Sequence, residues 1–374
     1  MIPFTKTYIA QNEKKYIEDV ITLDRQSGDG KYSKLCNKIL QAYSRKSYPL
    51  LTTSCTHSME MSALLLNIKS GDEVIIPSYS FSSTANAFLL RGAKIIFCDS
   101  QENNPNINIK NLESLITKNT KACVIVHYAG VACPMDEILN IGKRYGIKII
   151  EDAAQGIYAY YKKKPLGTIG DIGCLSFHDT KNVSCGEGGA IFVNDPSLNQ
   201  SAEIIREKGT DRAAYFRGEI DKYGWKSLGS SYLLSDILAA KLLAQLEELE
   251  QITKQRKRIW KYYFNSLSKL EEQGQCRMPN IPGYANHNGH NFYLFCQSSK
   301  EQDALLVHLK RNGAQATFHY IALHGSPYYI DKYKGDPLPN ADRFTECLVR
   351  LPIYPSLKYD NQARIIEAVY SFFN

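Results

Sequence analysis

No apolar run in this sequence of 374 residues approaches the roughly 20 residues that a membrane-spanning helix needs. The first 20 residues also lack the apolar core of a secretory signal peptide. The ten cysteines form no CxxC pair, and no His/Cys cluster has the spacing of a zinc site. We therefore expect a cytoplasmic protein with reduced, packed cysteines, no metal site and no contact with membranes.

A long basic run is also missing. The 45 Lys and Arg residues outnumber the 38 Asp and Glu residues, which gives a net charge of +7, but they are scattered along the chain. This distribution argues against nucleic-acid binding and is compatible with attraction of a small anionic substrate. The length and a hydrophobic content of 44% predict two domains, which we place at residues 1–245 and 246–374.

Short apolar runs alternate with helical segments in the first half of the chain, which is typical of βαβ units and a buried, mostly parallel sheet. Residues 236–270 have the pattern of one long charged helix leading to a smaller α/β domain. The fold class is therefore α/β. The expected strands are residues 49–53, 72–77, 93–99, 121–128, 147–152, 174–178 and 190–195, and the expected helices among them are residues 55–68, 83–92 and 136–146.

Polar side chains stand at the carboxyl ends of three expected strands, where open α/β sheets bind ligands. Residues 151–152 are Glu-Asp, residues 176–181 contain a serine, a histidine and a lysine, and residues 54–56 are Ser-Cys-Thr before a helix. Each feature alone has an ordinary alternative: a solvated strand end, a loop charge before a tight Gly-rich turn, and an N-cap. Together they supply an acid, an amine and the donors of a helix N-terminus.

This combination matches the needs of pyridoxal phosphate. Its aldehyde requires a lysine amine for a Schiff base, which Lys181 offers, and its ring nitrogen requires a carboxylate, which Asp152 offers. Its phosphate binds to a helix N-terminus and to hydroxyl donors. If the strand continues beyond Asp152, Ala154 lies under the ring, Gln155 donates to the ring hydroxyl and Phe81 covers the other face.

The strings "EDAAQG" (151–156) and "SFHDTKNVSCGEGGA" (176–190) resemble the nucleotide-sugar aminotransferases, a family of fold-type-I pyridoxal phosphate enzymes. Similar blocks run nearly from end to end of the chain. The blocks "CPMD" (133–136), "REKGTDR" (206–212) and "GSSYLLSD" (229–236) are similar to the subgroup that forms dTDP-4-amino-4,6-dideoxygalactose. The resemblance implies an aspartate-aminotransferase-like fold with a large domain and a smaller C-terminal domain.

The same resemblance implies a role for each cofactor residue. Lys181 matches the Schiff-base lysine, Asp152 the pyridine partner and Gln155 the ring-hydroxyl partner. Phosphate contacts are implied for Ser176, for the amides of Cys55 and Thr56, and for Ser231 from a partner subunit of a homodimer. Two positions depart from the family: Ser231 replaces a common asparagine, and Cys55 replaces a common glycine.

Substrate contacts are implied less specifically. A charged loop could clamp the diphosphate of a nucleotide sugar or could simply be a solvated loop. The candidates are Asp29, Gly30, Lys208, Arg212, Arg217, Lys222, His319, Tyr320 and His324. The dimer interface is expected near residues 28–30 and 229–236.

The implied reaction is amination of dTDP-4-keto-6-deoxy-D-glucose by L-glutamate, which gives dTDP-4-amino-4,6-dideoxy-D-galactose and 2-oxoglutarate for bacterial surface polysaccharide. The gluco epimer and other nucleotide keto sugars remain alternatives, because Lys181 alone does not fix which way up the sugar lies. A dinucleotide oxidoreductase would need G-x-G-x-x-G, which is absent after the first strand. A same-fold dehydratase would carry histidine in place of Lys181, and a non-catalytic regulator would need an added DNA-binding module.

Overall fold

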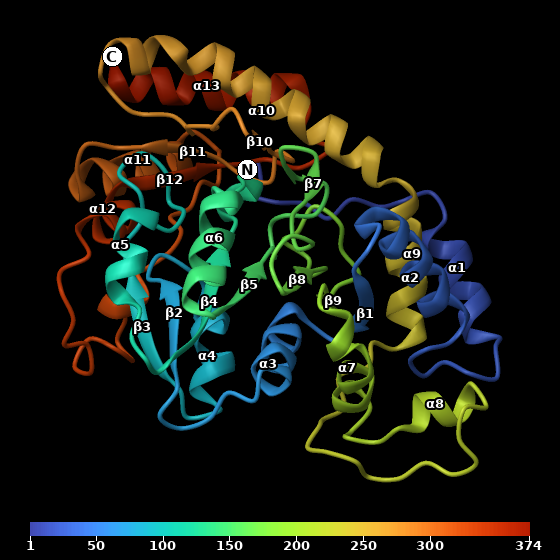
Figure 1. Cartoon of the computed structure of the whole chain (residues 1–374). Coiled ribbons are helices and arrows are strands. Elements are labelled where there is room, and N and C mark those ends of the chain that lie inside the picture. The colour runs from blue at the N-terminus through green and yellow to red at the C-terminus, as the bar shows by residue number, and fades with distance from the viewer.

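The computed structural model describes residues 1–374 and is built around a seven-stranded sheet (Figure 1). The strand order is β1-β9-β8-β5-β4-β2-β3, and every neighbouring pair is parallel except those that β9 makes with β1 and β8. The predicted α/β class with a mostly parallel sheet is therefore confirmed. The strands are β1 (Tyr48–Thr52), β2 (Glu73–Pro77), β3 (Lys94–Cys98), β4 (Thr120–Val126), β5 (Lys148–Asp152), β8 (Ile172–Ser176) and β9 (Gly189–Val193).

Both faces of this sheet are buried, which explains why its strands are almost continuously apolar. In β2, Val74 and Ile76 pack into one core with α3 (Cys55–Leu65) and α4 (Ser82–Leu89), whereas Ile75 faces a second core. That second core contains α6 (Met135–Tyr145). The period-2 alternation of a strand thus serves two hydrophobic layers at once.

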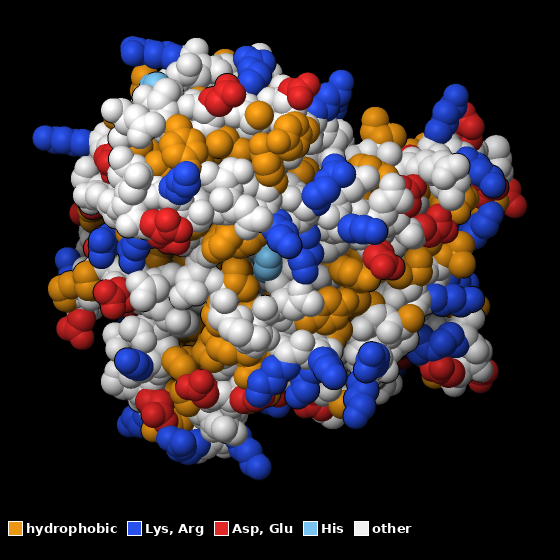
Figure 2. Space-filling model, turned by 90° about the horizontal axis from the view of Figure 1, so that it is seen from above, with side chains coloured by type: hydrophobic (Ala, Val, Ile, Leu, Met, Phe, Trp, Pro, Cys, Tyr) orange, Lys and Arg blue, Asp and Glu red, His pale blue; other side chains and the backbone are white.

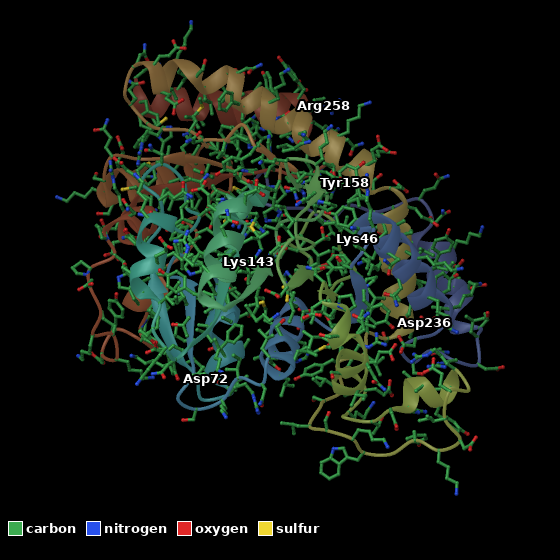
Figure 3. The ribbon with its side chains drawn as sticks, viewed as in Figure 1. Lys46, Asp72, Lys143, Tyr158, Asp236 and Arg258 are labelled. Atoms are coloured by element: carbon green, nitrogen blue, oxygen red, sulfur yellow. The ribbon has the colours of Figure 1, made fainter.

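Two N-terminal helices extend the second core. These are α1 (Glu13–Ile21) and α2 (Lys31–Ser44), and both pack on α9 (Asp236–Glu247) beside the edge strand β1 (Figure 1). Asp236, labelled in Figure 3, joins α9 to α2, because its carboxylate accepts hydrogen bonds from the amides of Tyr32 and Ser33 in the first turn of α2 at 3.0 and 2.7 Å. A carboxylate at a helix N-terminus also interacts favourably with the helix dipole.

The C-terminal part forms a separate layer above the sheet in Figure 1. The predicted single helix over 236–270 is two helices, α9 and α10 (Leu249–Glu272), separated at Glu248. The N-terminal segment packs against this break, because the Glu248 carboxylate accepts hydrogen bonds from the hydroxyl of Tyr8 and the amide of Gln11. The predicted domain boundary after residue 245 lies in the last turn of α9, two residues before its end at Glu247.

The remaining elements are short or belong to the C-terminal layer. They are α5 (Ile109–Leu112), α7 (Asn199–Arg206), α8 (Arg212–Phe216), α11 (Ser299–Arg311), α12 (Pro339–Cys347), α13 (Tyr359–Phe373), the pair β11 (Phe292–Phe295) and β12 (Leu348–Leu351), and the small sheet β6 (Tyr160–Tyr161), β7 (Lys164–Pro165) and β10 (Ala285–Asn286).

The surface charges, the helices and the arrangement of metal-binding side chains can be compared with what nucleic acids, membranes and metal ions require. On the face drawn in Figure 2, Lys and Arg side chains are spread among acidic and apolar ones. None of the helices combines the length and the apolar character that crossing a membrane requires. No group of three or more His, Cys, Asp or Glu side chains is arranged to hold a metal ion.

Candidate active site

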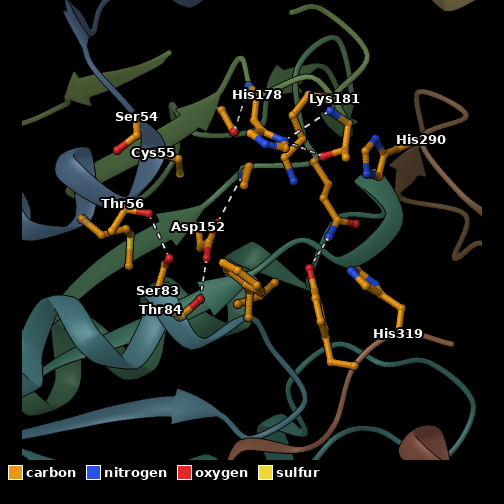
Figure 4. A pocket seen from close by; sticks show the side chains of 18 of the residues that line it. Ser54, Cys55, Thr56, Ser83, Thr84, Asp152, His178, Lys181, His290 and His319 are labelled. Atoms are coloured by element: carbon orange, nitrogen blue, oxygen red, sulfur yellow. Dashed lines mark hydrogen bonds between the residues drawn. The ribbon is translucent and has the colours of Figure 1, made fainter. Parts of the chain in front are cut away.

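A cavity of about 670 Å³ opens at the carboxyl ends of three parallel strands. Val126 ends β4, Asp152 ends β5 and Ser176 ends β8, and all three line the cavity. Parallel strands present their carboxyl ends at one edge of the sheet, so residues 126, 152 and 176 meet although they are far apart in sequence. The C-terminal part closes the opposite wall with residues 317–320 and Arg350 (Figure 4).

The N-terminus of α3 forms one side of this cavity. Ser54 caps the helix, since its hydroxyl accepts a hydrogen bond from the amide of His57 at 3.1 Å. Cys55 and Thr56 are the first two residues of α3, so no carbonyl of the helix can accept from their amides, and these amides can bind an anion. Gly189 permits this arrangement, because a Cβ at that position would lie 2.5 Å from the backbone nitrogen of Cys55.

Asp152 is held rigidly at the end of β5. Its carboxylate accepts a hydrogen bond from the Thr84 hydroxyl at 2.7 Å and from the Ala154 amide at 3.2 Å (Figure 4). Only 8% of the side chain is exposed. The chain turns directly after Asp152 instead of continuing as a strand, which corrects the strand geometry expected for Ala154. Ala154 nevertheless lines the cavity through this turn.

Lys181 enters the cavity from the loop after β8 (Figure 4). Its amide donates to the carbonyl of His178 at 2.9 Å, which fixes the loop, and its side-chain amine has no carboxylate within 4 Å. Burial lowers the pKa of the Lys181 amine, and Arg350 lowers it further, whereas Asp152 acts in the opposite direction. A buried amine of lowered pKa is the form that can act as a base or nucleophile near neutral pH.

Gln155 and Phe81 also line the cavity. The Gln155 amide donates to the Tyr320 hydroxyl at 3.0 Å, and its oxygen accepts from the Ala129 amide at 2.7 Å. Phe81 is 57% exposed and its ring lies 6.0 Å from that of Tyr320, so two aromatic side chains flank the cavity. His319 lines the same wall.

The two histidines of this wall are neutral at physiological pH. Burial lowers the pKa of His319, and the positive charges of Arg350 and Lys181 lower it further. Burial likewise holds the pKa of His290 well below its usual range, and His290 is fixed by a 2.8 Å hydrogen bond to the Asn182 amide oxygen. His319 can therefore hydrogen bond to a substrate but brings no positive charge to a diphosphate.

The remaining predicted substrate residues do not line this cavity in the single chain. Lys208 and Arg212 both pair with Glu207, and Arg217 pairs with Glu203 and Glu219. Ser231, Lys222 and His324 also lie outside it, and His324 hydrogen bonds to Ser78 instead. The loop that carries α8 projects away from the body of the molecule (Figure 1).

Asp29 and Gly30 are explained by local structure. Asp29 pairs with the buried Arg206 at 2.6 Å. A Cβ on Gly30 would lie 2.5 Å from the Asp236 carboxylate, so only glycine fits where α2 begins. Glu151 is structural too: it is fully buried and accepts hydrogen bonds from His127 and from three backbone amides of residues 167–170.

Several side chains of the cavity were missed in the sequence. Thr84 and Ser83 come from α4, and Ser83 accepts a hydrogen bond from Thr56 at 2.9 Å. His290 and Arg350 come from the C-terminal part, and Phe4 reaches the cavity from the N-terminus. The string "LVRLPIYPSL" was a signal for Arg350, since a lone arginine in an apolar strand must find a partner.

The family model described as the DegT/DnrJ/EryC1/StrS aminotransferase family matches residues 7–370. The chain belongs to this family. Among its relatives is the spore coat polysaccharide biosynthesis protein SpsC of Bacillus subtilis (strain 168), which is 31% identical over 377 residues that cover 98% of this chain and 96% of SpsC. The protein is thus a pyridoxal-phosphate-dependent sugar aminotransferase, and the predicted family is confirmed.

Solved structures agree with this fold. The putative sugar aminotransferase Spr1654 from Streptococcus pneumoniae, in its PMP form, superposes with a TM-score of 0.92 at 22% identity over 100% of this chain and 99% of that chain. NtdA from Bacillus subtilis with bound cofactor PMP gives a TM-score of 0.88 at 28% identity over 98% of this chain and 83% of that chain. The predicted fold-type-I architecture and the cofactor, pyridoxal phosphate, are therefore confirmed.

The donor set of the cavity fits this cofactor. It combines a buried amine at Lys181, a fixed carboxylate at Asp152 and a capped helix N-terminus at residues 54–56. The hydroxyls of Ser83 and Ser176 add further donors for a phosphate.

Proposed function

We propose that the protein transfers the amino group of L-glutamate to C4 of dTDP-4-keto-6-deoxy-D-glucose and forms dTDP-4-amino-4,6-dideoxy-D-galactose and 2-oxoglutarate. The observation that carries the site assignment is the Lys181 amine in one cavity with the Asp152 carboxylate. The choice of sugar is supported by the resemblance of residues 133–136, 206–212 and 229–236 to the galacto-forming subgroup.

Bound pyridoxal phosphate supplies an aldehyde that captures amines and a ring that accepts electrons from a broken C–H bond. Lys181 would hold the cofactor, and its free amine would take the proton from the donor's Cα and pass it to the cofactor. In the second half-reaction the amine would take that proton back from the cofactor and deliver it to C4 of the sugar. Its lowered pKa keeps it unprotonated for the first of these tasks.

The other residues bind and orient. Asp152 keeps a proton on the ring nitrogen, and Thr84 and the Ala154 amide keep its carboxylate in one position. The amides of Cys55 and Thr56, with the Ser176 hydroxyl, bind the phosphate.

Ala154 and Phe81 would cover the faces of the cofactor ring, and Gln155 would orient the ring hydroxyl. His319 and Tyr320, which line the same cavity, would contact the sugar.

We further infer a homodimer of twofold symmetry that completes the site. Ser231, Lys208, Arg212 and Arg217 lie outside the cavity of their own chain, so any contact that they make with such a cavity would be with that of a second copy. The same segment exposes Trp225 at 81%, which favours a protein contact there. A monomer with full activity, observed by analytical ultracentrifugation at the assay concentration, would refute the shared site.

Two observations support a proposal for the compartment and the biosynthetic role of the protein. The ten cysteines are all unpaired, as in a protein of a reducing compartment, so we place it in the cytoplasm. SpsC, by its name, serves polysaccharide biosynthesis. We infer that this protein provides an amino sugar for a bacterial surface polysaccharide.

The decisive experiment incubates the purified protein with dTDP-4-keto-6-deoxy-D-glucose and L-glutamate and identifies the product by proton NMR. We expect a small H3–H4 coupling, because an axial amine at C4 leaves H4 equatorial. A large coupling would show the gluco epimer. Absence of any aminated product would show that the sugar is a different one.

A further inference from the structure

Three arginines of the chain are buried, and two of them have structural partners. Arg206 pairs with the Asp29 carboxylate at 2.6 Å. Arg256 donates to the carbonyls of Gly289 and His290 at 3.2 and 2.8 Å. Although the Nε of Arg206 is also unbonded, its charge is neutralised by Asp29.

The third, Arg350, has a single neutral hydrogen-bond partner and no anion. It lies on β12, is 8% exposed and lines the cavity that contains Lys181. Its guanidinium donates to the Asn291 amide oxygen at 2.5 Å, while its Nε has no hydrogen-bond partner and no carboxylate lies within 4 Å. A buried guanidinium without an anion is costly, so its partner is expected to arrive with a ligand.

The surroundings of Arg350 are built for binding. Its guanidinium lies 4.6 Å from the ring centroid of Phe4, which covers one face. Asn291 links Arg350 to Gln155, because the Asn291 oxygen accepts from Arg350 while the Asn291 amide donates to the Gln155 oxygen at 3.3 Å. Arg350 and Lys181 line the same cavity. The positive charge of Arg350 also contributes to lowering the pKa of the Lys181 amine.

We propose that Arg350 binds the α-carboxylate of the amino-acid donor. In an amino acid this carboxylate is bonded to the Cα whose proton Lys181 must move, so an anion site in the same cavity as Lys181 fits it. The diphosphate of a nucleotide sugar is separated from C4 by the sugar ring and requires a site farther from the amine. A guanidinium also matches the two oxygens of a carboxylate. This inference rests on the proposed function for the donor, though not for the sugar.

The test uses the first half-reaction, which needs no sugar, followed by the absorbance change of the bound cofactor. The holoenzyme is titrated with L-glutamate and with 4-aminobutyrate, which is glutamate without its α-carboxylate. In Arg350→Gln we expect the half-saturating concentration of L-glutamate to rise at least about 10-fold, as for loss of charged hydrogen bonds. The half-saturating concentration of 4-aminobutyrate should stay unchanged, because this compound has no α-carboxylate, and the amount of bound cofactor before titration should remain that of wild type.

Two further variants make the test specific. Arg350→Lys keeps the charge but loses the paired donors, so it should show a smaller rise, and it serves if Arg350→Gln does not fold. Arg343→Gln removes an exposed arginine of the same segment outside the cavity and should behave as wild type.

Three results would overturn the inference. One is an unchanged half-saturating concentration for L-glutamate in both Arg350 variants. Another is a raised KM for the sugar nucleotide in the Arg350 variants while the half-saturating concentration of L-glutamate is unchanged, because Arg350 would then bind the diphosphate. The third is a wild-type holoenzyme that does not respond to L-glutamate, which would refute the proposed donor as well. The first two results leave the proposed donor intact.

Discussion

Replacement of Asp152 by asparagine removes the negative charge that the cofactor ring requires and keeps the size of the side chain. The side chain is 8% exposed and accepts two hydrogen bonds, from Thr84 at 2.7 Å and from the Ala154 amide at 3.2 Å. Asparagine keeps one acceptor for Ala154, and its amide can donate to the Thr84 hydroxyl. We therefore expect the free energy of unfolding to change by less than about 1 kcal/mol.

Activity should fall far more than stability. Removal of one preorganised charged or polar group from an active site typically costs about 10²–10³ in rate, or about 3–4 kcal/mol of transition-state stabilisation. The protonation of Lys181 cannot cause this loss, because Asp152 raises the pKa of that amine and its removal would leave more of the amine neutral. The charge on the cofactor ring is what Asp152→Asn removes.

The assay is the rate of the first half-reaction with saturating L-glutamate, measured by stopped-flow absorbance. Thr84→Val is the matched control, because it keeps the carboxylate and removes one hydrogen bond, which should cost about 5-fold. If Asp152→Asn stays within about 5-fold of wild type, or if Thr84→Val loses as much, the reasoning about charge is wrong.

Three more predictions follow from buried groups. Glu151→Ala leaves four donors without their acceptor, so urea unfolding should show a loss of at least about 4 kcal/mol, and a loss below about 1 kcal/mol would contradict the assigned network. Gly30→Val places a Cβ about 2.5 Å from the Asp236 carboxylate, so thermal unfolding should show a loss of about 1–3 kcal/mol, whereas an unchanged midpoint would mean that α2 can shift. The maximal rate of the first half-reaction should rise with pH through the pKa of the free Lys181 amine, because the amine acts as a base only when it is unprotonated. Burial and Arg350 both lower this pKa, so in Arg350→Gln the rise in rate should move to higher pH.

The polar strand ends could be found from sequence because parallel strands bring them together. Asp152 and Ser176 end neighbouring strands, and Lys181 follows the second of them. The alternation of strands and helices along the chain therefore predicts that all three lie at one edge of the sheet. Glu151 points to the other face of the same strand, as alternation requires. The order of the elements was therefore enough to predict the cofactor side of the cavity.

The opposite wall could not be predicted in this way. Thr84 is an ordinary hydroxyl of a helix, and it reaches Asp152 only because α4 packs against the sheet. His290 and Arg350 come from residues more than 100 positions after Lys181, and no local pattern joins them to it. Residues 28–30 illustrate the converse, because the packing of Asp236 gives glycine at position 30 a structural reason that the sequence does not show.

The central claim is that Lys181 carries the cofactor, and covalent trapping tests it most directly. Sodium borohydride reduces a C=N bond between a lysine amine and the cofactor aldehyde to a stable single bond. After reduction of the purified holoenzyme and proteolysis, mass spectrometry should find the added mass on Lys181, and Lys181→Ala should give no labelled peptide. Label on any other lysine, or label that persists in Lys181→Ala, would contradict the assignment.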